Sequence, residues 1–164
     1  MEHNVPNINP PKFADWDQAW HQVVAWQQQG LRVVLTNGCY DLLHYGHIYL
    51  LTKAKNLGDK LVLAVNSPES IRRLKGPSRP ILDRTSRLFI LSALEPVDLL
   101  VEFSQDTPLD LIRILKPDVL VKGGDYLPDT IVGSEVMAEY GGQVVVIPYQ
   151  EGFSTTGIAE KLNK

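Results

Sequence analysis

Short runs of consecutive apolar residues constrain the fold of this chain more than any other feature. The runs 61–65 (Leu-Val-Leu-Ala-Val) and 144–147 (Val-Val-Val-Ile) contain no alternating polar residues, so the strands that they predict are buried on both faces. Such strands belong to parallel sheets whose two faces are covered by helices. Because helical segments alternate with the predicted strands, we expect one three-layer α/β domain with about five parallel strands and flanking helices.

The other strand and helix signals follow one another in strict alternation. Residues 1–11 are polar and rich in proline, which predicts a loose arm, and residues 14–29 show the apolar spacing of an amphipathic helix. Residues 1–30 therefore form an arm and a helix ahead of a domain at 31–164. The predicted strands are 32–36, 60–66, 99–103, 119–122 and 143–148. The predicted helices are 14–29 (capped by Asp15 and ended by Gly30), 45–57, 83–94 (capped by Asp83), 108–116 (capped by Thr107), 130–140 and 155–162.

Composition excludes several classes of protein. A length of 164 residues fits one domain, and a net charge of −3 gives no support to a surface that binds nucleic acid. The single cysteine, Cys39, excludes a disulfide framework and a zinc site built from cysteines. The N-terminus has no apolar core of a secretory signal, and no stretch approaches the roughly 20 apolar residues of a membrane span. We therefore expect a cytoplasmic protein without a membrane partner.

The loop after the first strand of the domain carries the strongest chemical signal. Residues 36–41 (Thr-Asn-Gly-Cys-Tyr-Asp) end the strand, and His44-Tyr45-Gly46-His47 begins the next helix. The two imidazoles, three residues apart, share a helix face beside free N–H groups, which already favour an anion. Gly38 permits a close approach of the backbone to a ligand, and Gly46 leaves room for a nucleotide. The pattern predicts a cradle for a polyphosphate.

Other roles for these residues stay open. A histidine at a helix start is often only a cap, and a metal site with two histidines lacks a third ligand at suitable spacing. Asp41 could bind Mg²⁺, orient a histidine or cap the helix that begins near Leu42. Cys39 is interpreted as structural, because a thiol nucleophile needs a base and an acyl-type substrate.

Three further loops concentrate polar groups. Arg72, Arg73, Lys75 and Arg79 place four cations within eight residues, in either a solvated loop or a lid whose Lys75 grips a sugar or a triphosphate. Lys122 ends a strand before paired glycines, and it is either a solvated charge or a contact to a nucleotide. Residues 154–156 (Ser-Thr-Thr) either cap the last helix or form a second phosphate cradle.

Together the motifs resemble a known family. The loop at 36–41 and His44-Tyr45-Gly46-His47 are similar to the signature of the cytidylyltransferase-like nucleotidyltransferases. Further segments resemble, more narrowly, the adenylyltransferases that activate D-glycero-β-D-manno-heptose 1-phosphate for lipopolysaccharide core synthesis. The resemblance extends from Leu31 to the C-terminus, and it implies a Rossmann-like nucleotidyltransferase domain over 31–164. The further segments are Ala64-Val65-Asn66-Ser67, Arg73-Leu74-Lys75-Gly76, Ser78-Arg79-Pro80, Val121-Lys122-Gly123-Gly124-Asp125-Tyr126 and Ser154-Thr155-Thr156.

The resemblance implies a reaction in which ATP and heptose 1-phosphate give ADP-heptose and pyrophosphate, with Mg²⁺ as the cofactor. The attacking phosphate oxygen is already anionic, so the site needs no general base. It must hold two anions in line and stabilise charge on the α-phosphate and on the leaving pyrophosphate. His44 and His47 are therefore expected to act as hydrogen-bond donors.

The resemblance also implies partners. Members of this family are commonly dimers or larger, and the exposed part of the helix with Trp16, Trp20 and Trp26 could form a subunit interface. In many bacteria the domain follows a sugar kinase domain, for which 164 residues leave no room. We therefore expect a homo-oligomer, and a sugar kinase on a separate chain.

The resemblance completes the set of expected site residues. It implies Arg87 near the phosphates, Lys122 on a phosphate, Asp125 on the ribose or base, and Thr155 and Thr156 on the distal phosphates. The expected catalytic residues are His44, His47, Lys75 and Arg87. The expected nucleotide-binding residues are Thr36, Asn37, Gly38, Asp41, Gly46, Asn66, Lys122, Gly124, Asp125, Ser154, Thr155 and Thr156. No protein ligand to a metal is expected.

Two alternative functions differ in substrate or in chemistry. Glycerol-3-phosphate cytidylyltransferases carry an arginine shortly before the Ser-Thr-Thr segment, whereas residues 149–153 of this chain contain no cation. A nucleotide-binding sensor without catalysis is disfavoured, because both histidines, Lys75 and Lys122 are retained. The choice of base leaves little trace in the sequence, since adenine is normally read by backbone groups.

Overall fold

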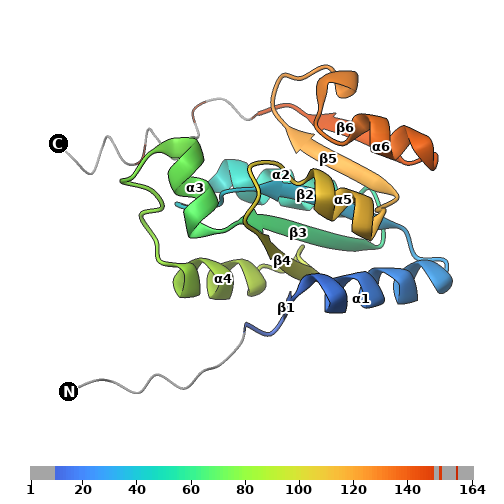
Figure 1. The fold of residues 1–164 in the computed structure, drawn as a ribbon, viewed down its shortest axis with the longest axis horizontal. Coiled ribbons are helices and arrows are strands. Elements are labelled where there is room, and N and C mark those ends of the chain that lie inside the picture. Colours follow the sequence, from blue (N-terminus) through green and yellow to red (C-terminus); the bar gives the residue numbers. More distant parts are fainter. Residues whose placement is uncertain (1–9, 150–151, 153–157, 159–164) are drawn as a thin grey trace.

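A parallel sheet of six strands forms the centre of the molecule (Figure 1). The computed structural model describes residues 10–149, 152 and 158, and the strand order in this part of the chain is β1-β4-β3-β2-β5-β6. The strands are β1 (Phe13–Ala14), β2 (Val33–Gly38), β3 (Lys60–Asn66), β4 (Leu99–Phe103), β5 (Val119–Gly123) and β6 (Gln143–Ile147). The helices are α1 (Trp16–Gln28), α2 (Tyr45–Lys55), α3 (Pro68–Lys75), α4 (Arg84–Ser92), α5 (Leu109–Leu115), the 3₁₀ turn η1 (Pro128–Thr130) and α6 (Ser134–Glu139).

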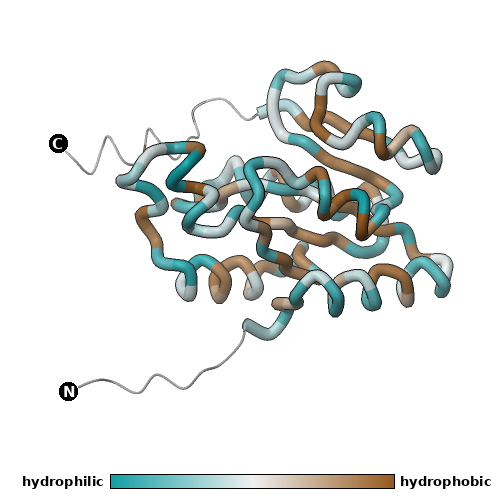
Figure 2. Tube along the Cα trace, in the orientation of Figure 1, coloured by the Kyte–Doolittle hydropathy of each residue, from teal (hydrophilic) through white to brown (hydrophobic). Residues whose placement is uncertain are grey.

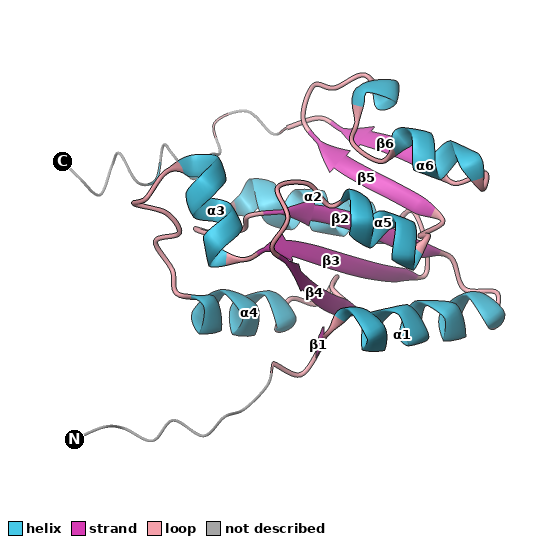
Figure 3. Cartoon of the chain, in the orientation of Figure 1, coloured by secondary structure: helices cyan, strands magenta, loops and turns pink. Residues whose placement is uncertain are grey.

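Helices cover both faces of the sheet, as the continuous apolar runs predicted (Figure 3). Successive residues of a strand point to opposite faces, so Leu35 packs with α1, α5 and α6, while Val34 packs with α2 and α4. The strands are accordingly the most hydrophobic part of the trace (Figure 2). The three-layer α/β prediction is confirmed. No helix in the described part of the chain has the length and apolar character to cross a membrane.

Most predicted elements are confirmed, two of them with their exact bounds. These two are β3 at 60–66 and β4 at 99–103. Asp15 caps α1 by accepting a 2.8 Å hydrogen bond from Gln18 N, while the Gln18 side chain accepts from Asp15 N in return. The sixth strand is β1, which pairs with β4 at the edge of the sheet and is too short for a sequence pattern.

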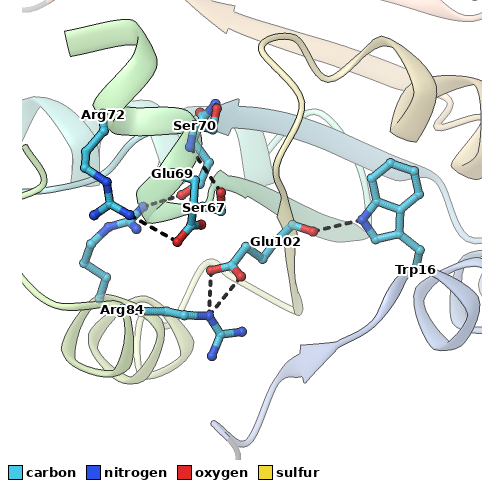
Figure 4. Close-up of polar contacts among 9 residues, drawn as sticks. Trp16, Ser67, Glu69, Ser70, Arg72, Arg84 and Glu102 are labelled. Carbon is cyan, nitrogen blue, oxygen red and sulfur yellow. Dashed lines mark hydrogen bonds and ion pairs between the residues drawn. The ribbon is translucent and has the colours of Figure 1, made fainter. Parts of the chain in front are cut away.

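Backbone and side-chain hydrogen bonds tie this edge together (Figure 4). Trp16 Nε1 donates to the Glu102 carbonyl at 2.9 Å, so the start of α1 is fixed to β4. The Glu102 carboxylate in turn accepts from Arg84 Nε at 2.9 and 3.0 Å, which joins β4 to the start of α4.

Three sequence predictions were wrong in detail. Helix α3 was predicted as a loop, although Ser67 caps it by accepting from Ser70 N at 3.2 Å and Pro68 occupies its first turn. The helix predicted at 130–140 is broken, because Gly133 adopts the left-handed φ of 97° before α6. Thr107 does not cap α5, since Pro108 occupies the N-cap position. Apart from Ile158, which is helical, the helix predicted at 155–162 lies outside the described residues, as does most of the arm at 1–11.

The chain topology positions the site. From the central strand β2 the chain proceeds to β3 and β4 on one side, and then to β5 and β6 on the other. The connections that leave the neighbouring strands β2 and β5 therefore run to opposite sides of the sheet. In open α/β sheets, the point between two such strands is a topological switch point, and it opens a crevice at the carboxyl ends of the strands.

The close packing of Gly133 against Ile112 of α5 can be tested by substitution. In Gly133→Ala the new Cβ would lie 2.6 Å from Ile112 Cδ1 and the backbone would keep a left-handed φ. We expect the free energy of unfolding, measured by urea titration with circular dichroism, to fall by about 2–3 kcal/mol. Gly141→Ala is the matched control, because Gly141 also has a positive φ but its Cβ would meet no atom within 4 Å. Equal losses in the two variants would contradict the packing described for Gly133.

Candidate active site

A cavity of about 480 Å³ lies at the carboxyl ends of the strands. Its lining extends from the loop after β4 to Tyr149 beyond β6, so the cavity crosses five neighbouring strands and includes the switch point. The Tyr149 ring lies against Gly123 and Gly124 at the end of β5, and with neighbouring strands about 4.8 Å apart the ends of β4 and β5 are roughly 14 Å apart. The lining residues are Asn37, Gly38, Cys39, Tyr40, Asp41, His47, Leu50, Asn66, Leu74, Lys75, Asp106, Thr107, Pro108, Lys122, Gly123, Tyr126, Thr130, Ile131, Val132 and Tyr149.

The two histidines meet at the start of α2. Their rings stack with centroids 3.9 Å apart, and His44 N donates a 3.3 Å hydrogen bond to His47 Nδ1. Because Nδ1 of His47 is an acceptor, the proton of its neutral ring lies on Nε2. His47 lines the cavity, whereas His44 is not among the lining residues, and its buried Nδ1 has no partner among the described residues.

The histidines are held in the neutral form. Burial, followed by the charges of His44 and Lys75, lowers the pKa of His47 from 6.5 to about 4. Burial also lowers the pKa of His44. Near pH 7, His47 therefore presents a neutral Nε2–H donor and is too weak a base to abstract a proton efficiently.

Two lysines supply the positive charge of the cavity. Lys75 is the last residue of α3, and Lys122 lies half-buried near the end of β5. Burial lowers the pKa of Lys122, since desolvation disfavours its charge. Neither lysine takes part in an ion pair within the described part of the chain, so both are available to an anionic ligand.

Asp41 has a structural role that differs from the three roles that its position in the sequence left open. Its carboxylate accepts hydrogen bonds from Ile81 N and Leu82 N at 2.9 Å and from Arg79 Nη1 at 3.2 Å. Burial alone would raise the pKa of Asp41, but these donors outweigh burial and the net pKa is lowered. The ionised carboxylate thereby fixes the segment after α3 to the loop after β2.

Arg87 is placed behind the cavity wall. Its side chain is 1% exposed, and its guanidinium donates to the carbonyls of Cys39, Tyr40 (3.4 Å) and Asn66 (2.9 Å). These three carbonyls belong to residues that line the cavity at the ends of β2 and β3. Arg87 therefore fixes the backbone from which the nucleotide loop begins, and its Nη1 has no partner among the described residues.

The other expected residues divide into three groups. Asn37, Gly38 and Asn66 line the cavity with His47, Asp41 and the lysines. The second group lies outside the lining and consists of Thr36, Gly46, Gly124 and Asp125. The Thr36 hydroxyl instead donates a 3.0 Å hydrogen bond to the Val121 carbonyl inside the sheet. Ser154, Thr155 and Thr156 lie outside the described residues.

The cavity also contains residues that the sequence analysis did not select. Tyr126 and Tyr149 lie against Gly124 and make the wall at the end of β5 aromatic. Leu74 on α3 is an apolar lining residue, and Asp106 and Thr107 come from the loop after β4. In parallel α/β sheets the loops after the strands carry the ligand site, so the position of Asp106 and Thr107 directly after a predicted strand was a signal for them, although Thr107 was interpreted only as a helix cap. Within the described part of the chain, no group of three His, Cys, Asp or Glu side chains could hold a metal ion.

The sequence is similar to a protein family and to several known proteins. Residues 35–161 match the protein family described as Cytidylyltransferase-like. The bifunctional protein HldE of Magnetococcus marinus is 47% identical over 93% of this chain, and that of Syntrophotalea carbinolica is 54% identical over 83%. The chain spans 31% and 28% of the length of these two relatives.

Two solved structures share the architecture. A lipopolysaccharide core biosynthesis protein from Thermoplasma volcanium is 31% identical, with a TM-score of 0.58 over 74% of this chain and 98% of that one. A pantoate-beta-alanine ligase from Francisella tularensis superposes with a TM-score of 0.60 over 92% of this chain and 76% of its own. Its identity of 17% shows a common fold alone.

The state of His47 can be measured directly. We expect its imidazole resonances to titrate with a midpoint near the lowered pKa of about 4, and to show the Nε2–H tautomer at pH 7. Nuclear magnetic resonance of the imidazole nitrogens measures both, with His47→Asn to assign the signals.

The lowered pKa of His47 also makes the stability of the fold depend on pH. Since the unfolded chain titrates near the ordinary pKa of 6.5, it binds the extra proton in the window between that value and about 4. The contribution of His47 to stability is therefore fully present above this window and is lost as pH falls through it. A midpoint near 6.5 in the folded protein would contradict the burial described.

Proposed function

The chain belongs to the cytidylyltransferase-like family, and on that premise we propose that this nucleotidyltransferase transfers AMP from ATP to D-glycero-β-D-manno-heptose 1-phosphate. The products are ADP-heptose and pyrophosphate. One observation carries the proposal: a cavity that crosses five strands and presents the Nε2–H of His47 and two unpaired lysines. The similarity to HldE proteins and to a lipopolysaccharide core biosynthesis protein supports a heptose phosphate as the acceptor.

The proposed reaction is a single displacement at phosphorus. An anionic oxygen of the heptose 1-phosphate attacks the α-phosphorus of ATP and forms a new P–O bond. The bond from that phosphorus to the oxygen that bridges to the β-phosphorus breaks, and pyrophosphate leaves with the electron pair. No proton has to be removed from the acceptor, which agrees with a histidine that is too weak a base for that role.

The protein groups then act by positioning and by charge. His47 Nε2–H donates to the phosphate on which charge develops, and the backbone N–H of His44 keeps the His47 ring in the required tautomer. Lys122 and Lys75 neutralise the phosphates from two sides of the cavity. Arg87 acts as a positioning residue, because it holds the carbonyls of the loop rather than the cavity surface.

The donor set fits a Mg²⁺ ion that ATP brings with it. Mg²⁺ usually keeps several waters and uses one or two carboxylates together with substrate phosphates. Asp41 and Asp106 are the carboxylates among the described lining residues, and each is already engaged by an arginine, Arg79 or Arg73. A Mg²⁺ ion bound to the phosphates of ATP would therefore keep phosphate oxygens and waters as its main ligands, and it would supply further charge neutralisation beside Asp41 and Asp106.

Pyrophosphate release tests the substrate assignment. ATP, CTP, GTP and UTP would each be paired with heptose 1-phosphate, mannose 1-phosphate and glycerol 3-phosphate. We expect ATP with heptose 1-phosphate to be preferred. Preference for CTP with glycerol 3-phosphate would replace the substrate assignment, and binding without release for every pair would indicate a sensor.

A histidine variant tests the mechanism. We expect His47→Ala to lower kcat by about 10²–10³, by analogy with the loss of one oxyanion donor, with little change in the KM for ATP. His21→Ala is the matched control, because His21 is an exposed histidine on α1 that does not line the cavity. Full activity of His47→Ala would contradict the proposed role of the imidazole.

A further inference from the structure

We infer that Asp106 and Thr107 form the wall of the cavity that binds the hydroxyl groups of the acceptor sugar. This inference rests on the proposed function and specifies which residues select a sugar phosphate. The two residues lie in the loop between β4 and α5, they line the cavity, and the sequence analysis assigned neither of them to the site.

The walls of the cavity differ in hydrogen-bonding character. His47, Lys75 and Lys122 are donors toward the cavity, whereas Asp106 offers a carboxylate and Thr107 a hydroxyl. A sugar 1-phosphate complements these two walls. Its phosphate only accepts hydrogen bonds, which suits the donor wall, while its ring hydroxyls also donate them, which suits Asp106 and Thr107. The loop at 106–107 leads into α5, which packs on the sheet face opposite α2 and its His47. A phosphate held by the donors therefore directs its sugar toward Asp106 and Thr107.

The side chains of both residues keep free hydrogen-bonding capacity. Arg73 Nε donates to Asp106 Oδ1 at 2.9 Å, and the other carboxylate oxygen, Oδ2, accepts no hydrogen bond within the described part of the chain. The Thr107 hydroxyl, predicted as a helix cap, has no partner among these residues, because Pro108 occupies the N-cap position of α5.

Hydrogen bonds from α3 hold this loop in place. Ser70 Oγ donates to the Gln105 carbonyl at 2.9 Å, and Arg73 also donates to the Ser104 carbonyl, so α3 is fixed to the loop at two points. Figure 4 shows Ser70 in the first turn of α3, where it is hydrogen-bonded to Ser67. Since Lys75 ends the same helix, the phosphate donor and the hydroxyl acceptors belong to one fixed unit, which lowers the entropy cost of binding.

The length of the cavity supports two substrates in one row. Asp106 and Thr107 follow β4, while Lys122 and Tyr149 lie at β5 and beyond β6. The strands β4 and β5 are three spacings apart, so these two ends of the cavity lie roughly 14 Å apart, and the Tyr149 ring lies against Gly123 and Gly124 at the β5 end. The nucleotide and the acceptor can therefore lie at opposite ends with their phosphates meeting near His47.

Equilibrium binding tests this inference without relying on turnover. Calorimetry would measure the Kd of heptose 1-phosphate in the presence of α,β-methylene-ATP, which cannot be cleaved. For Asp106→Asn and Thr107→Val we expect the Kd to rise by about 10- to 100-fold and by about 5- to 10-fold, respectively. Asp106→Asn keeps an oxygen for Arg73, so the loop stays fixed. Asp110→Asn, at an exposed residue of α5 paired with Arg113, is the matched control.

Binding of a second ligand, methyl phosphate, distinguishes loss of hydroxyl recognition from structural damage to the loop. It carries the phosphate without ring hydroxyls, so its Kd should be the same in wild type and in both variants. Equal weakening of both ligands, or no weakening of heptose 1-phosphate, would overturn the inference, as would absence of heptose phosphate binding to the wild type. Selective weakening in a protein that releases no pyrophosphate would support the inference and refute the proposed function.

Discussion

The arrangement of the cavity depends on how the backbone is held where β2 and β3 leave the sheet. Carbonyl groups there no longer have strand partners, and buried carbonyls without partners are costly. Arg87 donates hydrogen bonds to the carbonyls of Cys39 and Tyr40, in the loop after β2, and of Asn66, the last residue of β3. Because one planar guanidinium binds all three, the loop that leads to the histidines has a single geometry before a ligand arrives.

Asp41 performs the complementary task for N–H groups. Its carboxylate accepts from Ile81 and Leu82, whose segment connects α3 to α4. One buried cation thus holds carbonyls and one buried anion holds amides, on either side of the same loop. The cations that face the cavity, Lys75 and Lys122, are left without carboxylate partners in the described structure and remain available to phosphates.

The sequence allowed much of the fold to be predicted, and for a clear reason. Strands buried on both faces must be continuously apolar, so β3 and β4 were located with their exact bounds. Helix α3 was missed because it has only eight residues, and only Ser70 and Ile71 among them are buried, so few apolar residues mark its buried face. The break before α6 depends on a left-handed Gly133, which a glycine in a sequence permits but does not require.

The sequence by itself determined the family, the three-layer architecture and the loop that carries His44 and His47, because these are properties of local pattern and of spacing along the chain. Only the tertiary structure decided that Arg87 lies behind the wall and that Asp41 holds a distant segment. It alone brought the loop after β4 into the cavity with Lys122. The physical reason is that a hydrogen bond or a shared cavity depends on separation in space, which strand order sets and which residue identity alone does not reveal.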